Sequence, residues 1–351
     1  MEYRKLGRSG LQVSAFGLGV MTFGGQTPED DAFRQMDMGH EVGITLFDTA
    51  ENYPTPTGPA TQGRSEELLG RWIASRGLRG KVVVATKVAG PGNAAGDMTH
   101  IRGASRRLDR ANIRQAAEDS LRRLGTDTID LYQVHWPERA VSTLGRSRFS
   151  ALPSDPAEVP IGETLAALGE LVGEGKVRAI GVCNESPWGA MHYLAHAKRD
   201  GHPRIASIQN SYSLLERYYE LGLAELGLRE DLGLLGYSPL ASGTLTGKYG
   251  DAPAPIPGSR SAASPAFVGR LLTENRQRAI AAYVSLARDH GLEPAQMALA
   301  FARAQPFMAS VLVAASRAEQ LKDNLAAIEL VLPREVTQAI NAIHDANPNP
   351  K

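Results

Sequence analysis

The strongest constraint on the fold is an alternation of short apolar runs with amphipathic segments, which repeats through almost the whole chain. The apolar runs are rich in Val, Ile and Leu, which is typical of strands buried on both faces of a parallel sheet. The segments between them have helical periodicity and often end at a glycine. We count eight such units, with strands predicted at 17–20, 44–48, 82–87, 129–135, 179–184, 205–210, 234–238 and 310–315.

The segments between these strands predict helices that fit the same repeat. In the third unit, Asp109 can cap the start of a helix and Gly125 its end. Residues 2–16 alternate around a Gly-Arg-Ser-Gly turn and predict a β-hairpin instead. The predicted helices cover 28–42, 65–76, 109–124, 161–173, 187–199, 219–228, 274–290, 294–304 and 318–327, with a terminal helix at 333–345.

Eight strand-helix units predict a single α/β domain over residues 1–351, namely a (β/α)8 TIM barrel with an N-terminal β-hairpin. A bare barrel needs roughly 250 residues, so this chain has insertions. They fall in the connections that follow strands, at 54–64, 88–108, 136–160 and 239–273. Because long loops gathered at one rim usually carry function, we expect the site at that rim.

Three consecutive predicted strands end on polar residues. Asp48 ends the second strand, Lys87 the third and His135 the fourth, and Tyr53 follows Asp48 by five positions. Any one of these residues alone is more often a loop cap, a solvated charge or a structural histidine. Since the carboxyl ends of barrel strands meet at one rim, their succession predicts that the four side chains converge.

These residue types suit the reduction of a carbonyl group, which needs a hydride at carbon and a proton at oxygen. Tyrosine, with an ordinary pKa of about 10, is a reluctant proton donor near neutrality. A lysine cation close to the phenol would lower the pKa of the tyrosine. We therefore expect Tyr53 to donate the proton, Lys87 to lower its pKa, Asp48 to keep Lys87 charged, and His135 to orient the substrate oxygen.

The motifs that contain these residues resemble the aldo-keto reductase superfamily almost from end to end. The branch that the chain resembles most is that of the Tas-like bacterial reductases, near the potassium-channel β-subunits. The resemblance implies an NADPH-dependent reductase of aldehydes or ketones with these same four catalytic residues. It rests on Phe-Asp-Thr-Ala-Glu-Asn-Tyr at 47–53, Thr-Lys at 86–87, Asp-Leu-Tyr-Gln-Val-His at 130–135, Ile-Gly-Val-Cys-Asn at 180–184, Gln-Asn at 209–210, Tyr-Ser-Pro-Leu at 237–240 and Leu-Thr-Gly-Lys-Tyr at 245–249.

The resemblance also implies how the cofactor is bound. A Rossmann fingerprint fails, because residue 22 is a threonine where the third glycine should stand. By resemblance, the nicotinamide would lie at Asn184, Gln209 and Tyr237, and the 2′-phosphate at Lys248 and Arg260. The full set of expected cofactor contacts is Gly19, Asp48, Asn184, Gln209, Tyr237, Ser238, Leu240, Ser242, Gly243, Lys248, Arg260, Ser316, Gln320, Asp323 and Asn324, with Met21 and Trp136 lining the substrate pocket.

Composition bounds the remaining possibilities. Lys+Arg and Asp+Glu are each 38, so no net charge favours nucleic acid or an anionic membrane. A single cysteine excludes an internal disulfide, and no apolar run is long enough for a membrane span, so we expect a cytoplasmic protein. No metal is expected, and a homo-oligomer is compatible with the sequence. Two rival functions are an NADPH-binding sensor with little turnover and a lyase that uses Lys87 as a Schiff base.

Overall fold

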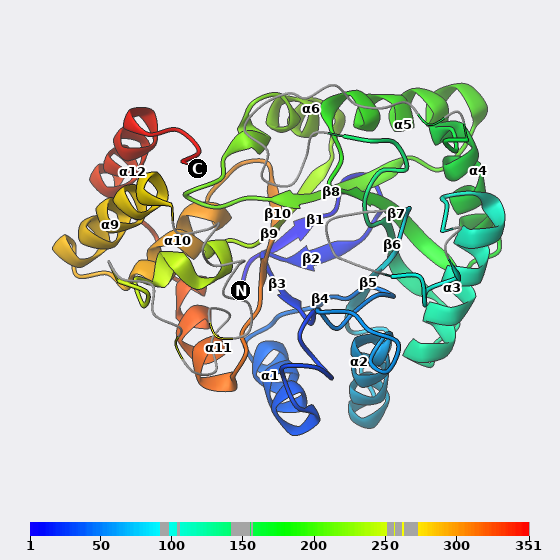
Figure 1. Cartoon of the computed structure of the whole chain (residues 1–351), viewed down its shortest axis with the longest axis horizontal. Coiled ribbons are helices and arrows are strands. Elements are labelled where there is room, and N and C mark those ends of the chain that lie inside the picture. Colours follow the sequence, from blue (N-terminus) through cyan, green and yellow to red (C-terminus); the bar gives the residue numbers. More distant parts are fainter. Residues whose placement is uncertain are drawn as a thin grey trace.

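In a computed structural model, eight parallel strands close into a barrel with helices outside it (Figure 1), as the sequence predicts. The structure describes residues 1–91, 98–103, 106–141, 155, 157–250, 256, 262 and 273–350. The order of the strands around the barrel is β10-β3-β4-β5-β6-β7-β8-β9. Their bounds are β3 Phe16–Gly19, β4 Leu46–Asp48, β5 Val83–Val88, β6 Ile129–Val134, β7 Val177–Cys183, β8 Ile205–Ser211, β9 Gly233–Tyr237 and β10 Met308–Val313.

The helices surround this barrel, and most helices that follow one another in the chain pack side by side (Figure 1). Asp109 caps helix α3 by accepting a hydrogen bond from the Asn112 amide at 2.8 Å, and Gly125 ends that helix with a φ of 62°, as predicted. The bounds are α1 Glu29–Glu41, α2 Arg64–Arg76, α3 Arg110–Leu124, α4 Ile161–Gly173, α5 Pro187–Asp200, α6 Leu223–Glu230, α9 Glu274–Asp289, α10 Pro294–Arg303, α11 Ala318–Leu325 and α12 Arg334–Ala346.

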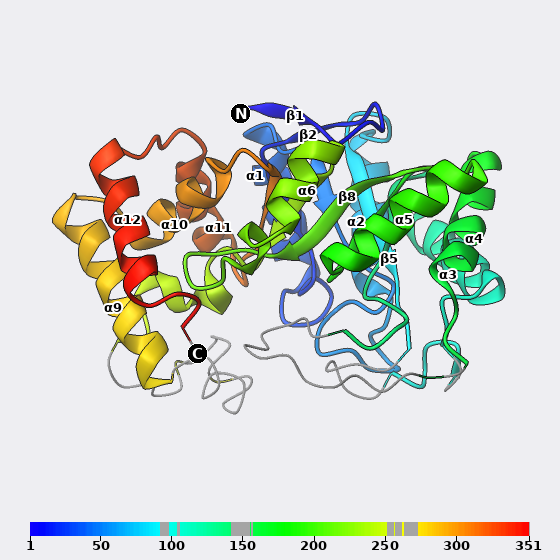
Figure 2. The same cartoon turned by 90° about the horizontal axis from the view of Figure 1, so that it is seen from above.

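The N-terminal hairpin closes one end of the barrel (Figure 2). Its strands, β1 (Tyr3–Lys5) and β2 (Gln12–Ser14), pair antiparallel. Leu6, Leu11 and Val13 are buried and pack against apolar side chains from the strands. This end is therefore an apolar floor, which leaves the opposite mouth, at the carboxyl ends of the strands, for a site.

Several predicted boundaries differ from the structure by one or two residues, such as β4, predicted from 44, and β10, predicted at 310–315. Two further differences have local reasons. Phe16 was assigned to the hairpin but begins strand β3, since its neighbour Ala15 already bonds to the barrel strand β10. The helix predicted at 219–228 is two elements, a 3-10 turn at Tyr218–Glu220 and helix α6. Gly222 separates them with a φ of 115°, a conformation that ends a helix.

No described helix is long and apolar enough to cross a membrane.

Candidate active site

The side chains predicted to act together do meet at the mouth opposite the hairpin. Asp48 is the last residue of β4, Lys87 lies near the end of β5, and His135 directly follows β6. Asp48 stands opposite Ala85 in the β4–β5 pair, and Lys87 stands opposite Gln133 in the β5–β6 pair. The register of three neighbouring strands therefore carries these groups to one level of the barrel.

A buried ion pair forms the base of the site. Lys87 Nζ lies 2.6 Å from Asp48 Oδ2, and the lysine and aspartate side chains are 0% and 5% exposed. The ammonium also donates to the Thr49 carbonyl at 2.7 Å. Burial lowers the pKa of Lys87, but the charge and hydrogen bond of Asp48, together with the nearby Tyr53 and Cys183, more than offset this and raise the pKa above its usual value. Lys87 is therefore a fixed cation.

The second oxygen of Asp48 is held by two amides. Asp48 Oδ1 accepts from Gln209 Nε2 at 2.9 Å and from Gln133 Nε2 at 3.2 Å. Gln209 Nε2 also lies 3.3 Å from Gln133 Oε1. Each carboxylate oxygen thus has a donor, which a buried carboxylate requires. Gln133 was not among the predicted site residues, although it lies inside the motif at 130–135.

Tyr53 stands beside this pair, with Lys87 Nζ 5.1 Å from the centre of its ring. Burial raises the pKa of the Tyr53 phenol to about 12, although the charge and hydrogen bond of Lys87 lower it. The expectation that Lys87 would bring the pKa of Tyr53 below its ordinary value was therefore wrong. The cation acts in the expected direction, but desolvation of the phenolate outweighs it.

His135 faces Tyr53 across the mouth. The two rings meet edge to face, with their centres 5.6 Å apart. Burial and the charge of Lys87 hold the pKa of His135 well below its usual value, so the imidazole is neutral at neutral pH. Its Nδ1 is buried and has no hydrogen-bond partner among the described residues. A neutral ring can orient a carbonyl oxygen by hydrogen bonding.

Trp136 and Met21 lie at the edges of this group. The indole packs against His135 with ring centres 4.6 Å apart and donates to the Pro91 carbonyl at 2.8 Å. It also packs with Ala89, Met98 and Ile101 in a small buried cluster. Met21 is half-buried, and its carbonyl accepts from Thr55 at 3.0 Å, which ties it to the loop after Tyr53.

The residues expected at the nicotinamide end three further neighbouring strands. Tyr237 at the end of β9 donates to Asn184 Oδ1 at 2.6 Å, and Asn184 Nδ2 donates to the His135 carbonyl at 2.9 Å. Gln209, from β8, is already bonded to Asp48. This chain of contacts links the predicted nicotinamide residues directly to the predicted catalytic residues. The single cysteine, Cys183, is buried beside them at the end of β7.

The segment after β9 has an unusual backbone. Ser238, Ala241, Ser242 and Gly243 have φ values of 56°, 46°, 60° and 87°. Non-glycine residues in this region are strained and often mark a ligand site. A side chain at 243 would come within 3.1 Å of Lys248 Nζ, which lies just above the turn. Leu240 is half-buried and Lys248 is exposed; Arg260 lies outside the described residues.

The remaining predicted cofactor residues lie on β3 and after β10. Ser316 donates through its hydroxyl to Gln320 Oε1 at 3.0 Å, at the start of α11. Asn324 is buried on that helix and Asp323 is exposed. Gly19 lies at the mouth, opposite Asp48 in the β3–β4 pair. Because β10 lies between β9 and β3, these residues continue the rim beyond the strained turn.

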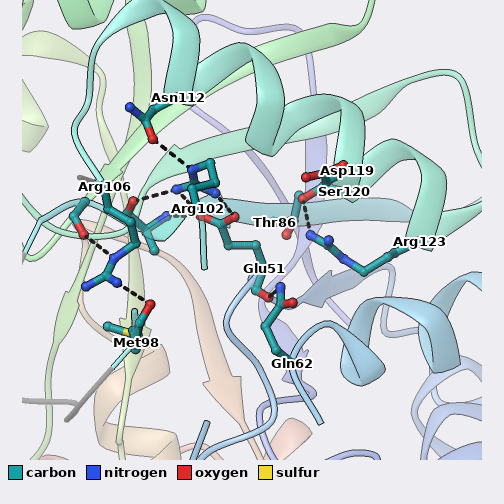
Figure 3. Close-up of polar contacts among 12 residues, drawn as sticks. Glu51, Gln62, Thr86, Met98, Arg102, Arg106, Asn112, Asp119, Ser120 and Arg123 are labelled. Atoms are coloured by element: carbon teal, nitrogen blue, oxygen red, sulfur yellow. Dashed lines mark hydrogen bonds and ion pairs between the residues drawn. The ribbon is translucent and has the colours of Figure 1, made fainter. Parts of the chain in front are cut away.

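Two further residues border the site without having been predicted. Glu51 is 2% exposed and is paired with Arg102, which is 11% exposed (Figure 3). Glu51 lies inside the motif at 47–53, so its position was visible in the sequence. Arg102 lies in a long loop without periodicity, and no sequence pattern marks it. Glu185, which directly follows Asn184, is buried and paired with Arg139.

One family profile and several known proteins are similar to this chain over most of its length. The sequence profile of the aldo/keto reductase family matches residues 15–345. The chain is 48% identical over 344 residues to "Protein tas" of Escherichia coli (strain K12), covering 98% of both chains. It is 34% identical to "Uncharacterized oxidoreductase YrpG" of Bacillus subtilis (strain 168), covering 98% of this chain and 96% of the relative. An "Aldo-keto reductase" of Babesia bovis is 34% identical over 74% of this chain.

Proposed function

We propose that this chain reduces aldehydes or ketones to alcohols with NADPH. The premise is that the chain belongs to the aldo/keto reductase family and is therefore an oxidoreductase. The observation that carries the proposal is the buried pair of Lys87 and Asp48 beneath the facing rings of Tyr53 and His135. This arrangement offers a proton, a fixed cation and a neutral hydrogen-bonding ring at one point. Those are the groups that carbonyl reduction asks of a protein.

In the proposed reaction, Tyr53 gives its proton to the substrate oxygen as negative charge develops there. The phenol, with a pKa of about 12, is fully protonated at neutral pH and so is always loaded for this step. Lys87 stabilises the phenolate that forms, since the attraction between the two charges grows as the proton leaves. Neutral His135 orients the oxygen, and Asp48 holds Lys87 in place.

The bound dinucleotide would supply the hydride. Asn184, Gln209 and Tyr237 would hold its nicotinamide next to the catalytic residues to which they are already linked. The strained turn at 238–243 suits a pyrophosphate, because left-handed residues turn backbone amides toward an anion and Gly243 leaves room beside Lys248. Lys248, with Arg260, Ser316 and Gln320, would take the 2′-phosphate.

The lyase alternative is disfavoured by the state of Lys87. A Schiff base needs a neutral amine, whereas the pKa of this lysine is raised by Asp48. The ammonium is also occupied by Asp48 Oδ2 and the Thr49 carbonyl. We therefore favour the reductase over the lyase.

The experiment is steady-state oxidation of NADPH with a panel of small aldehydes and ketones. We expect turnover with at least one compound, and a loss of turnover when Tyr53 is replaced by Phe. Tight NADPH binding without turnover on any compound would replace the reductase by the sensor. Borohydride trapping of a substrate on Lys87 would favour the lyase instead.

The preference for NADPH has its own test in the double substitution Lys248→Ala with Arg260→Ala. Loss of two cations should weaken NADPH much more than NADH, because only NADPH carries the 2′-phosphate. Fluorescence titration with both cofactors measures this, with the exposed pair Arg229→Ala and Arg278→Ala as a control for lost surface charge. An unchanged preference would show that the 2′-phosphate binds elsewhere.

A further inference from the structure

A buried polar cluster lies next to the catalytic residues but contributes nothing to the proton transfer just described. Its centre is the ion pair of Glu51 and Arg102, drawn in Figure 3. Burying two charges is costly unless their geometry and hydrogen bonds compensate.

Glu51 joins the turn that carries Tyr53 to the strand that carries Lys87. Its Oε1 accepts from the Ala89 amide at 2.5 Å, just beyond the end of β5. Its own amide donates to the Lys87 carbonyl at 3.2 Å, and its carbonyl accepts from Gln62 at 2.6 Å. The carboxylate therefore connects Glu51, two positions before Tyr53, to Ala89, two positions after Lys87.

Arg102 extends the same connection to a third segment. Its guanidinium contacts both oxygens of Glu51 and donates to the Ala89 carbonyl at 3.0 Å and to Asn112 at 3.1 Å. Arg102 itself has a φ of 50°, a strained conformation for a residue with a side chain. The ion pair thus holds the 98–103 segment in a backbone shape that it would not adopt readily by itself.

That segment supplies the wall beside Trp136. Met98 and Ile101 are buried, at 1% and 4% exposed, against Trp136 and Ala89. Arg106 reinforces the segment from its other side by donating to the Met98 carbonyl. Arg102 therefore connects the wall of the expected substrate pocket to the turn of the proton donor.

We propose that Glu51 and Arg102 are positioning residues that lock the Tyr53 turn to the end of the Lys87 strand and hold the Met98–Ile101 wall against Trp136. The proposal rests on the proposed function for the reaction that the pair supports. It assigns to the pair a role in turnover and in carbonyl binding, not in cofactor binding, because the residues expected to hold the nicotinamide and the phosphates lie on other strands and loops.

A second ion pair provides a matched control. Glu66 and Arg123 are 0% and 12% exposed, as buried as Glu51 and Arg102, and Arg123 is drawn in Figure 3. Glu66 accepts from Thr86 and Arg123, at 2.6 Å each, but bonds to no residue of the Tyr53 turn. Arg123→Met should therefore lower the unfolding temperature without moving the proton donor.

The experiment compares Glu51→Gln, Arg102→Met and Arg102→Lys with Arg123→Met. We expect the first two to lower kcat about 10- to 100-fold, the usual cost of a displacement near 1 Å, to raise KM for the carbonyl, and to leave the Kd for NADPH unchanged. Arg102→Lys should retain more of kcat than Arg102→Met, because lysine keeps the positive charge but cannot bond both oxygens of Glu51 as the guanidinium does. Arg123→Met should keep kcat and KM within about threefold of the unchanged protein, because its partner Glu66 shares no bond with the Tyr53 turn and such separate sites act nearly independently.

A readout that does not depend on turnover separates this inference from the proposed function. Tyrosine labelled at its Cζ carbon gives one NMR resonance for Tyr53, assigned by its absence in Tyr53→Phe. We expect this resonance to shift in Glu51→Gln and Arg102→Met and to stay in place in Arg123→Met, even if no aldehyde is reduced. An unmoved resonance and unchanged kcat, with an unfolding temperature lowered as in Arg123→Met, would reduce the pair to a structural one and overturn the proposal.

Discussion

Asp48 and Asp130 are both buried carboxylates on barrel strands, but Asp48 lies at the mouth and Asp130 at the end closed by the hairpin. They are also neutralised by different partners. Asp130, near the start of β6, accepts from Arg79 and Arg178 at 2.8 Å each and from the Val84 amide at 2.9 Å. Those two arginines are 33% and 56% exposed. Asp48 has one cation, Lys87, which is wholly buried.

The two carboxylates differ in whether their cationic partners are exposed to water or buried. At the floor, the cations that neutralise the carboxylate reach water, and an apolar hairpin seals the centre of the barrel. At the mouth, the buried Lys87 cation lies close to the Tyr53 phenol and to the His135 imidazole. The Nδ1 of that imidazole has no partner among the described residues. Charge held away from water acts strongly on its neighbours, so the mouth can shift protonation states in a way that the floor cannot.

The largest effect should come from removing the phenol. Tyr53→Phe should lower turnover by about 10² to 10⁴, the usual worth of a positioned general acid, with little change in unfolding temperature. Tyr132→Phe is the control, because the Tyr132 hydroxyl is buried on the outer side of β6 and has no hydrogen-bond partner among the described residues. Steady-state kinetics of both variants measure this, and a fully active Tyr53→Phe would remove the residue from its role.

The two carboxylates can be compared directly by replacing each with asparagine. Asp48→Asn leaves Lys87 buried without its partner, which costs about 3–5 kcal/mol of unfolding free energy, and it should also lower turnover. Asp130→Asn should cost about 1–3 kcal/mol, because its arginines can turn to water, and should leave turnover unchanged. Urea denaturation and kinetics measure the two effects. A loss of turnover in Asp130→Asn would mean that the floor and the mouth are coupled.

The floor should be sensitive to packing alone. Leu11→Ala removes a side chain that is 4% exposed between the hairpin and the barrel, and should cost about 2–5 kcal/mol of unfolding free energy. We expect unchanged kcat and KM at a temperature where the variant is folded. Thermal denaturation followed by kinetics tests this, and a change in KM would contradict an independent floor.

The barrel was predictable because its strands are buried on both faces and so read as continuous apolar runs between glycine-ended helices. What failed was local. The 3-10 turn before α6 depends on the φ of Gly222, and the end of the hairpin depends on which strand Ala15 meets. Neither backbone choice changes the hydrophobic pattern, so periodicity cannot reveal it.

The convergence of Asp48, Lys87 and His135 was predictable because parallel strands bring their carboxyl ends to one rim. The net pKa of Tyr53 was not, since it depends on how much water surrounds the phenol, which no spacing of residues expresses. Arg102 was missed for a similar reason: its role comes from a strained loop that meets Glu51 across the fold. Sequence shows which groups a strand end delivers, whereas burial and loop contacts decide how they behave.

The smallest effect in this comparison is a dependence of stability on pH that originates at the mouth. The pKa of His135 is held well below its usual value by burial and by Lys87. Below about pH 6.5, the unfolded chain binds a proton at this histidine that the folded protein does not bind. The free energy of unfolding should therefore fall as the pH drops through that range, and His135→Asn should make the fall shallower. Urea denaturation at about pH 5 and pH 7 measures the slope. An unchanged slope in His135→Asn would mean that the imidazole takes up its proton equally in the folded and the unfolded protein, so that burial and Lys87 do not lower its pKa.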